Sequence, residues 1–300
     1  MHGGHNHSHA PASYGWAFAL GTALNAAFVL LQFGYGYIAN SLVLISDAVH
    51  NLSDVLSLML AWGAVWLGGK TPTATRTYGY RRASILAALA NAALLLVAVG
   101  AIVFEAIRRF GEPEPVASDT VLWVAALGIL VNGATALFFM RGREHDINIQ
   151  GAFLHMAADA GVSLGVVIAA LLIRWTGHDW IDPVASLLVA AVIVGSSWKL
   201  TRDAFNLAMD AVPSHIDSGE VRECLASLEG VESVHDLHIW AMSTTETALT
   251  AHLVCRDRAR CEGLLAEAAR ELDARFHIHH VTLQIESGER DCSQAPAHTV

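Results

Sequence analysis

Residues 83–107 read ASILAALANAALLLVAVGAIVFEAI, and Glu105 is the only ionisable side chain among them. An α-helix of about 20 apolar residues spans the hydrocarbon core of a membrane, which is about 30 Å thick. The many alanines of the stretch favour close packing against neighbouring helices in lipid. The stretch therefore predicts a transmembrane helix.

Five other apolar stretches accompany this one. The six lie at residues 14–38, 41–67, 83–107, 120–140, 151–173 and 183–198. Of the 300 residues, 54% are hydrophobic and 15% are charged, whereas soluble proteins carry about 25% charged residues. This composition excludes coiled-coil, collagenous and disordered chains and disfavours a water-soluble domain. The predicted fold class is an α-helical membrane protein with six transmembrane helices.

The basic residues predict the orientation of the six helices. Loops on the side of the termini hold Lys70, Arg76, Arg81, Arg82, Arg141, Arg143, Lys199 and Arg202, and the other loops hold Arg108, Arg109 and Arg174. Cytoplasmic loops are enriched in Lys and Arg, so both termini are expected in the cytoplasm. Residues 1–10 do not resemble a cleaved signal peptide, and the short loops suit a bacterial inner membrane.

The last third of the chain has a different composition. Residues 199–300 hold 17 acidic and 9 basic residues, which predicts a separate acidic domain and argues against a nucleic-acid partner. Helical or strand patterns at residues 218–228, 231–242, 248–254, 261–276 and 280–285 predict an αββαβ order in an α+β domain. The expected organisation is a His-rich cytoplasmic segment (1–13), a transmembrane domain (14–207), a cytoplasmic domain (208–290) and a tail (291–300).

Two of the apolar stretches contain the same ionisable pattern, HxxxD. It occurs as His50 and Asp54 in the second stretch and as His155 and Asp159 in the fifth. Residues four apart lie on one face of a helix, so each stretch presents an imidazole next to a carboxylate. Two His and two Asp that converge suit tetrahedral Zn²⁺. The alternative is that each pair is an internal hydrogen bond of a helix bundle.

Other polar residues in the apolar stretches have less specific interpretations. Asp47 lies on the same stripe as His50 and is either a hydrogen-bond acceptor that orients the His50 ring or a cap at the start of the helix. Asn25, Gln32 and Asn132 are interpreted as interhelical hydrogen-bonding groups, with pore lining as the alternative.

Five motifs together are typical of one transporter family: residues 46–54 (SDAVHNLSD), 78–82 (YGYRR), 155–159 (HMAAD), 213–217 (PSHID) and 235–240 (HDLHIW). In these motifs the chain resembles the cation diffusion facilitator family, in its zinc/cadmium efflux branch that is related to animal zinc transporters. The resemblance implies a homodimer of six-helix protomers with a ferredoxin-like cytoplasmic domain that exchanges Zn²⁺ for H⁺ across the lipid bilayer.

The resemblance also implies roles for individual residues. The transport site of the family falls on His50, Asp54, His155 and Asp159. A charge interlock at the dimer interface falls on Arg82 and Asp210; the alternative is that these are a topology charge and a solvated charge. A cytoplasmic metal site, where Zn²⁺ would act as a regulatory ion, falls on His235, His252, His279 and Glu286.

Several neighbouring residues compete for the cytoplasmic site. His238 and His280 lie close to the expected ligands, and Gln284 stands where some relatives have His. The Cys pair that ends some animal relatives is reduced here to Cys292, so a ligand set supplied by the tail is not expected. The alternative to a regulatory site is a constitutive dimerisation domain.

The predicted function is secondary active export of Zn²⁺, or Cd²⁺, from the cytoplasm in exchange for H⁺. The alternatives are efflux of Co²⁺, Ni²⁺, Fe²⁺ or Mn²⁺, and a membrane metal sensor. An enzyme is not expected, because catalytic zinc keeps an open ligand position and the sequence has no HExxH motif. The tract of His2, His5, His7 and His9 is expected to capture metal weakly.

Overall fold

The computed structural model describes residues 15–112, 114–140, 147–256, 261–288 and 292. The chain divides into two compact units. The first unit comprises residues 1–58 and 93–197, and the second comprises residues 59–92 and 198–300. The N-terminal His tract, Arg141 and Arg143 lie outside the described residues.

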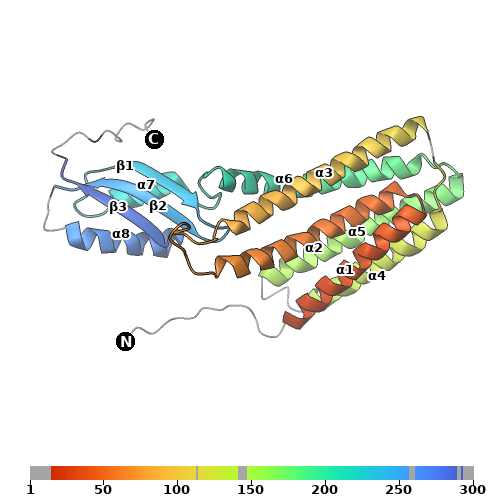
Figure 1. Cartoon of the computed structure of the whole chain (residues 1–300), viewed down its shortest axis with the longest axis horizontal. Coiled ribbons are helices and arrows are strands. Elements are labelled where there is room, and N and C mark those ends of the chain that lie inside the picture. Colours follow the sequence, from red (N-terminus) through yellow and green to blue (C-terminus); the bar gives the residue numbers. More distant parts are fainter. Residues whose placement is uncertain (1–14, 113, 141–146, 257–260, 289–291, 293–300) are drawn as a thin grey trace. The chain divides into compact units, whose positions relative to one another are not determined.

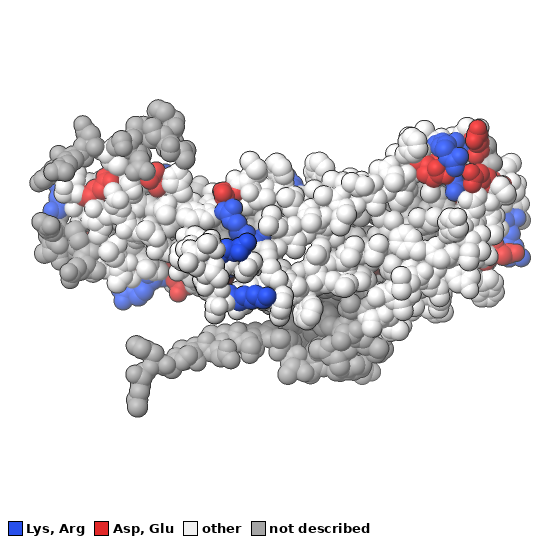
Figure 2. Space-filling view, viewed as in Figure 1, with Lys and Arg blue, Asp and Glu red and all other residues white. Residues whose placement is uncertain are grey.

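Helices occupy all six apolar stretches within the described residues (Figure 1). They are α1 (Gly15–Ile38), α2 (Leu42–Gly68), α3 (Ala83–Gly111), α4 (Ser118–Met140), α5 (Ile147–Thr176) and α6 (Ile181–Ala208). Five of them, α2 to α6, are long and apolar enough to cross a membrane, and a shorter apolar helix covers Ala23–Ile38 of α1. The prediction of a helical transmembrane domain is confirmed at this level. Figure 2 shows long stretches of helical surface without Lys, Arg, Asp or Glu.

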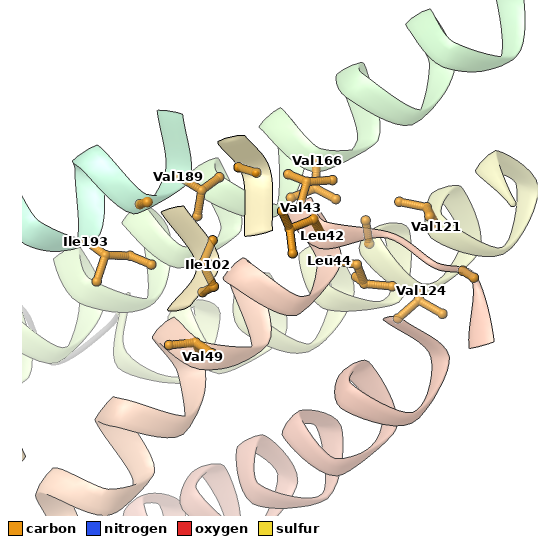
Figure 3. Close-up of a cluster of buried hydrophobic side chains, with 14 of the residues drawn as sticks. Leu42, Val43, Leu44, Val49, Ile102, Val121, Val124, Val166, Val189 and Ile193 are labelled. Atoms are coloured by element: carbon orange, nitrogen blue, oxygen red, sulfur yellow. The ribbon is translucent and has the colours of Figure 1, made fainter. Parts of the chain in front are cut away.

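The core of the first unit is an apolar cluster to which all six helices contribute (Figure 3). The first turn of α2 lies within it, where Val43 and Leu44 are 0% exposed. The labelled members are Leu42, Val43, Leu44, Val49, Ile102, Val121, Val124, Val166, Val189 and Ile193. The cluster therefore packs side chains of separate helices around the start of α2.

Gly128 allows α4 to pack closely against α1 and α5. A Cβ atom at this position would lie 2.9 Å from Cζ of Phe28 and 3.0 Å from Oγ of Ser163, too close for an ordinary contact. At Gly161, by contrast, a Cβ atom would meet nothing within 4 Å. Small residues at helix contacts permit such an approach in membrane proteins.

A buried carboxylate from α6 holds the start of α2. Asp182 is 0% exposed and accepts hydrogen bonds from Oγ of Ser41 at 2.6 Å and from the backbone N–H groups of Leu42 at 2.6 Å and Val43 at 3.3 Å. The guanidinium of Arg109 also lies near Asp182, with Nη1 3.8 Å from Oδ2. The first N–H groups of a helix have no partner within the helix, so Asp182 caps α2 from a distant part of the chain.

The same network extends over the loops at this end of the first unit. Arg109 donates to the backbone oxygen of Asn40 at 2.7 Å and to its side-chain oxygen at 2.8 Å, and it pairs with Glu105 at 3.1 Å. Asn40 has a φ of 51° and donates to Glu114 at 2.8 Å. This hydrogen bond, together with Arg108, holds the pKa of the Glu114 carboxyl below its usual range. The loops at this end are thus tied together by charged hydrogen bonds.

The C-terminal elements follow the predicted αββαβ order. They are α7 (Ser218–Ala226), β1 (Ser233–Ala241), β2 (Thr247–Val254), α8 (Cys261–Phe276) and β3 (His280–Glu286) (Figure 1). The sheet order is β1-β2-β3, with β1 antiparallel and β3 parallel to β2. Asp217 caps α7 by accepting from the N–H groups of Gly219 at 2.7 Å and Glu220 at 3.2 Å.

The two faces of this sheet have different side chains. Leu249, Ala251 and Leu253 of β2 belong to the apolar core of the second unit. Helices α7 and α8 contribute to the same core, so both pack on this face. Because side chains alternate along a strand, His252 of β2 points to the opposite face. The register pairs His252 with His235 of β1 and with Gln284 of β3, which brings polar side chains together there.

Candidate metal centre

The two HxxxD pairs lie on helices α2 and α5, which the first unit places next to each other. His50 and Asp54 are four residues apart on α2, and His155 and Asp159 are four residues apart on α5. In each pair the two side chains are therefore on one face of their helix. The structure brings all four side chains into one cluster.

The contacts in this cluster run mainly between the helices. His50 Nε2 lies 3.1 Å from Asp159 Oδ1, and His155 Nε2 lies 3.5 Å from Asp54 Oδ2. His155 Nε2 is also 3.7 Å from Asp159 Oδ2 on its own helix. The two imidazole rings have centroids 6.4 Å apart and are nearly perpendicular. The interpretation of each pair as a hydrogen bond within its own helix therefore does not describe the shortest contacts.

These separations suit a tetrahedral metal. Zn–N and Zn–O bonds of about 2.1 Å at tetrahedral angles set ligand atoms about 3.4 Å apart. The three contacts, at 3.1, 3.5 and 3.7 Å, lie around this value. Ligand atoms of His50, Asp54 and Asp159 all lie within 4.8 Å of one another, whereas His155 is not part of this group of three. Two nitrogen and two oxygen donors form a ligand set that favours zinc over a harder cation.

Exposure changes across the cluster. The side chains of His155 and Asp54 are 44% and 28% exposed, whereas those of His50 and Asp159 are 12% and 3% exposed. Beyond His50, toward the start of α2, the chain enters the apolar cluster of Figure 3. The cluster of candidate ligands is therefore exposed on the side of His155 and Asp54, and the apolar cluster closes it on the side of His50 and Asp159.

Asp47 has partners other than His50. Its Oδ2 atom accepts from Nε2 of Gln32 at 2.7 Å and from Oγ of Ser163 at 3.2 Å. Gln32 in turn accepts from Nδ2 of Asn51 at 2.9 Å. The expected hydrogen bond that would orient the His50 ring is not among these contacts. The alternative of a helix cap is wrong, because α2 begins five residues earlier at Leu42.

The three uncharged polar residues of the predicted spans differ in their contacts. Gln32 makes interhelical hydrogen bonds, as predicted. Asn25 donates to Sδ of Met156, at 3.7 Å. Asn132 is 0% exposed, and neither its nitrogen nor its oxygen has a hydrogen-bond partner in the described part of the chain. Ser163, which the sequence analysis did not single out, follows Asp159 by four residues, and this spacing was the available signal.

A second cluster lies on the sheet face opposite α7 and α8. Ligand atoms of His235, His252, Glu286 and Cys292 all lie within 4.8 Å of one another. Glu286 is 3.2 Å from Nε2 of His235 and 3.0 Å from Nδ1 of His252, and Cys292 Sγ is 3.6 Å from Nδ1 of His252. Two imidazoles, a thiol and a carboxylate are all groups that bind zinc.

His279 is not part of this cluster, which corrects the predicted ligand set. Its Nδ1 lies 2.7 Å from Asp273 Oδ1 on α8. His279 directly precedes β3, whereas Glu286 ends that strand, and a strand rises about 3.3 Å per residue. The two residues are therefore at opposite ends of β3. Cys292, which was not expected to contribute, lies where a fourth ligand would be needed.

The other competitors for the site have separate contacts. His238 Nε2 lies 2.9 Å from Asp236, and the ring of His280 packs edge-to-face on Tyr78. Gln284 donates to Glu286 at 3.0 Å. Burial raises the pKa of Glu286. Hydrogen bonds from Cys292 and Gln284, together with the nearby His235 and His252, lower this pKa by more than burial raises it, so it lies below its usual range.

Comparison with known proteins shows the family of the chain. The family model described as "Cation efflux transmembrane domain" matches residues 18–207, and the model described as "Cation efflux protein, cytoplasmic domain" matches residues 213–288. The chain belongs to the cation efflux family. Cation efflux is a transport activity, and the chain is accordingly a transporter and not an enzyme.

Relatives in the cation efflux family resemble the chain over most of its length. A "Cadmium, cobalt and zinc/H(+)-K(+) antiporter" of Bacillus velezensis is 36% identical over 95% of this chain and 92% of its own. "Zinc transporter ZitB" of Escherichia coli is 34% identical over 88% of this chain and 84% of its own. "Proton-coupled zinc antiporter SLC30A2" of Homo sapiens is 29% identical over 92% of this chain and 78% of its own.

The predicted charge pair of this cation efflux protein forms within one chain. Arg82 and Asp210 both lie in the second unit, and Nη2 of Arg82 donates to Oδ1 of Asp210. Each side chain is 53% exposed. The adjacent Arg81 donates to Glu246 in the β1–β2 turn. The loop before α3 is thus joined by two ion pairs to the C-terminal elements of the second unit.

Proposed function

We propose that this protein exports Zn²⁺, and Cd²⁺ as a second cargo, from the cytoplasm in exchange for H⁺. The observation that carries the proposal is the convergence of two HxxxD pairs, whose cross-helix contacts of 3.1 and 3.5 Å are near the ligand separations of tetrahedral zinc. His50, Asp54, His155 and Asp159 are the proposed ligands. The names of the relatives, which include zinc transport, cadmium and proton coupling, support the same cargo and counter-ion.

We also propose a membrane topology, a cellular location and an oligomeric state for the protein. We infer six membrane-spanning helices with α1 as the first, both termini in the cytoplasm, and a bacterial inner membrane as the location. The αββαβ elements are inferred to form a ferredoxin-like cytoplasmic domain at residues 208–290, after a transmembrane domain at residues 14–207. We also infer a homodimer, in which the pair of Arg82 and Asp210 stabilises the region next to the interface.

Exchange with protons follows from the chemistry of the proposed ligands. Imidazole binds zinc only in its neutral form, and carboxylates bind it in their ionised form. Zn²⁺ and protons therefore compete for the same atoms of His50 and Asp159. Where the site faces a near-neutral cytoplasm, zinc displaces the protons. Where it faces a more acidic exterior, protons displace zinc, and the protonated site returns.

We infer that this structure is the cytoplasm-facing state. The inference is supported by the exposure of the His155 and Asp54 side chains and by the apolar cluster that closes the opposite side. By the inferred topology, α2 runs toward the cytoplasm and Asp54 lies on the cytoplasmic side of His50. Alternating access would then require the helices around the start of α2 to separate.

The test is zinc flux in reconstituted liposomes with an enclosed dye and an imposed pH gradient. Asp159→Asn should abolish flux, because it removes an anionic ligand that is 3% exposed. The matched control is Asp119→Asn, since Asp119 is 70% exposed at the start of α4 and contacts Arg174 at 2.8 Å. Flux that ignores the gradient overturns the antiport. Zinc binding without flux would favour a membrane sensor, and repeating the assay with Cd²⁺, Co²⁺, Ni²⁺, Fe²⁺ and Mn²⁺ ranks the alternatives.

A second zinc site with a regulatory role is proposed on the cytoplasmic sheet. It is supported by the cluster of His235, His252, Glu286 and Cys292. Zinc per protomer is measured by elemental analysis in full-length Asp159→Asn protein, which lacks a transport ligand. Adding Cys292→Ser should lower the affinity of the remaining site about 10-fold or more, whereas adding His279→Ala should leave it unchanged. Equal effects of the two variants contradict this ligand set.

A further inference from the structure

Asp47 is a buried carboxylate that the proposed ligand set does not use. It is 0% exposed, and both of its hydrogen bonds, from Gln32 at 2.7 Å and Ser163 at 3.2 Å, reach the same oxygen, Oδ2. The other oxygen, Oδ1, is buried and has no hydrogen-bond partner within the residues that the structure describes. A buried anionic oxygen without a donor is costly in an apolar surrounding.

The surroundings of Asp47 fix which oxygen is available. Gln32 accepts from Asn51 through its oxygen, so its amide nitrogen faces Asp47 as a donor. Both donors therefore occupy Oδ2, where a proton would face the hydrogens of Gln32 and Ser163. A proton on Asp47 must be on Oδ1. An oxygen without a hydrogen-bond partner, next to one that accepts two hydrogen bonds, is what we expect of a carboxyl group that is protonated in one state and ionised in another.

Asp47 lies about one helical turn from the proposed zinc ligands. Asp47 precedes His50 by three residues on α2, and its partner Ser163 follows Asp159 by four residues on α5. Both displacements are about one helical turn, about 5 Å, and both lead toward the closed side. Among the described residues, the titratable groups that act on Asp47 most are His50 on its own helix and Asp159 on α5, while α1 contributes the uncharged Gln32.

We propose that Asp47 is a proton carrier of the exchange, separate from the zinc ligands. When the ion site is empty, Asp47 holds a proton on Oδ1. When Zn²⁺ binds one turn away, its two positive charges favour the ionised carboxylate; the O–H bond at Oδ1 breaks, the proton passes to water, and the carboxylate keeps its two hydrogen bonds at Oδ2. The reverse step protonates Oδ1 and weakens zinc binding. This inference rests on the proposed zinc/proton exchange.

The proposed role of Asp47 sets the number of protons that are released when a zinc ion binds. Because Asp47 is protonated when the ion site is empty and ionised when zinc is bound, each zinc ion that binds should release one proton beyond those displaced from its ligands, and the same proton in turn weakens zinc binding. The variant Asp47→Asn has the same size and keeps an acceptor oxygen for Gln32 and Ser163, but it cannot bind the proton. It should release one proton fewer per zinc ion.

The experiment counts these protons by titration calorimetry. Full-length protein in detergent is titrated with Zn²⁺ at one pH in two buffers of different ionisation enthalpy. Asp47→Asn should lower the proton count by about one and reduce the slope of log Kd against pH by about one unit, and Asp47→Glu should restore both. The exposed Asp119→Asn is the matched control and should match wild type. A residue that only joins helices would change thermal stability without changing the proton count.

An unchanged proton count and slope in Asp47→Asn overturn the proposal. Should this variant not fold, Ser163→Ala provides the second test: losing a donor to Oδ2 disfavours the ionised form, so the pH of half-maximal zinc binding must rise, and an unchanged midpoint overturns the proposal. Failure of the zinc/proton exchange itself is recognised separately, because zinc flux of the wild type in liposomes would then ignore the pH gradient.

Discussion

We predict that the buried carboxylate of Asp182 holds the start of α2, the helix that carries His50 and Asp54, in place. It is 0% exposed and accepts hydrogen bonds at 2.6, 2.6 and 3.3 Å from Ser41, Leu42 and Val43. Asp182→Ala would leave these donors buried without an acceptor. It would also remove the carboxylate that lies 3.8 Å from Arg109, whose side chain is 8% exposed.

The loss of unfolding free energy in Asp182→Ala can be calculated from these contacts. Loss of an N-cap costs about 1 kcal/mol, and each hydrogen bond to a charged group contributes about 1.5–3 kcal/mol. Removing one partner of a buried ion pair costs about 3–5 kcal/mol, but Arg109 retains Glu105 and Asn40 as partners. These effects overlap, so Asp182→Ala should lower the free energy of unfolding by about 3–5 kcal/mol. Asp182→Asn keeps one acceptor oxygen and should cost about 1–2 kcal/mol.

Thermal melting in detergent measures the effect. A loss of about 4 kcal/mol corresponds to a fall in Tm of roughly 10 °C for a domain of this size. The control is Asp119→Ala, also in the first turn of a helix, whose side chain is 70% exposed and pairs with Arg174 at 2.8 Å. An exposed pair contributes less than about 1 kcal/mol. If Asp182→Ala and Asp119→Ala melt within about 3 °C of each other, Asp182 does not hold α2.

Three further predictions concern packing and charge. Gly128→Val places atoms in the contact of α4 with α1 and α5 and should cost about 1–3 kcal/mol, whereas Gly161→Val enters open space and should melt like wild type. Asn132→Leu removes two buried polar atoms that lack hydrogen-bond partners within the described residues, so its melting temperature should be equal or higher; a clear fall would contradict the assignment. Arg82→Gln and Asp210→Asn, alone and together, should give a coupling below about 1 kcal/mol that disappears at high salt, because both side chains are 53% exposed; a larger coupling in the double-mutant cycle refutes this.

The parts of the fold that sequence reasoning predicts are those set by local patterns. An apolar stretch in a nearly uncharged sequence can satisfy its backbone in lipid only as a helix, so the positions of α2 to α6 follow from hydropathy. The spacing of His50 and Asp54 fixes one helix face without any knowledge of the partner helix. That two such faces meet is an inference from chemistry, since four buried ionisable groups that stayed apart would be costly.

The parts that sequence reasoning misses depend on register and on distant contacts. His279 and Glu286 both look suitable as ligands, but the cluster requires residues at one end of the sheet, and the pairing of β2 with β3 puts His279 at the other. Asp182 and Arg109 each look like an ordinary charge at the end of an apolar stretch. Only the fold reveals that α6 caps α2 across 140 residues of sequence.

The cross-helix arrangement of the transport cluster also bears on how zinc would bind. His50 Nε2 lies within hydrogen-bond distance of Asp159, at 3.1 Å, whereas the 3.5 Å contact of His155 with Asp54 is not a hydrogen bond, and Oδ2 of Asp54 has no hydrogen-bond partner among the described residues. Ligand atoms of His50, Asp54 and Asp159 already lie within 4.8 Å of one another, so we expect the ion to enter among these three with little movement of α2 and α5, while His155 would have to come closer to complete the set. Binding would displace protons from the His and Asp side chains. Zinc affinity should then be limited by the removal of protons more than by rearrangement of the helices. The pH on each side of the membrane thereby becomes the main control over loading and release.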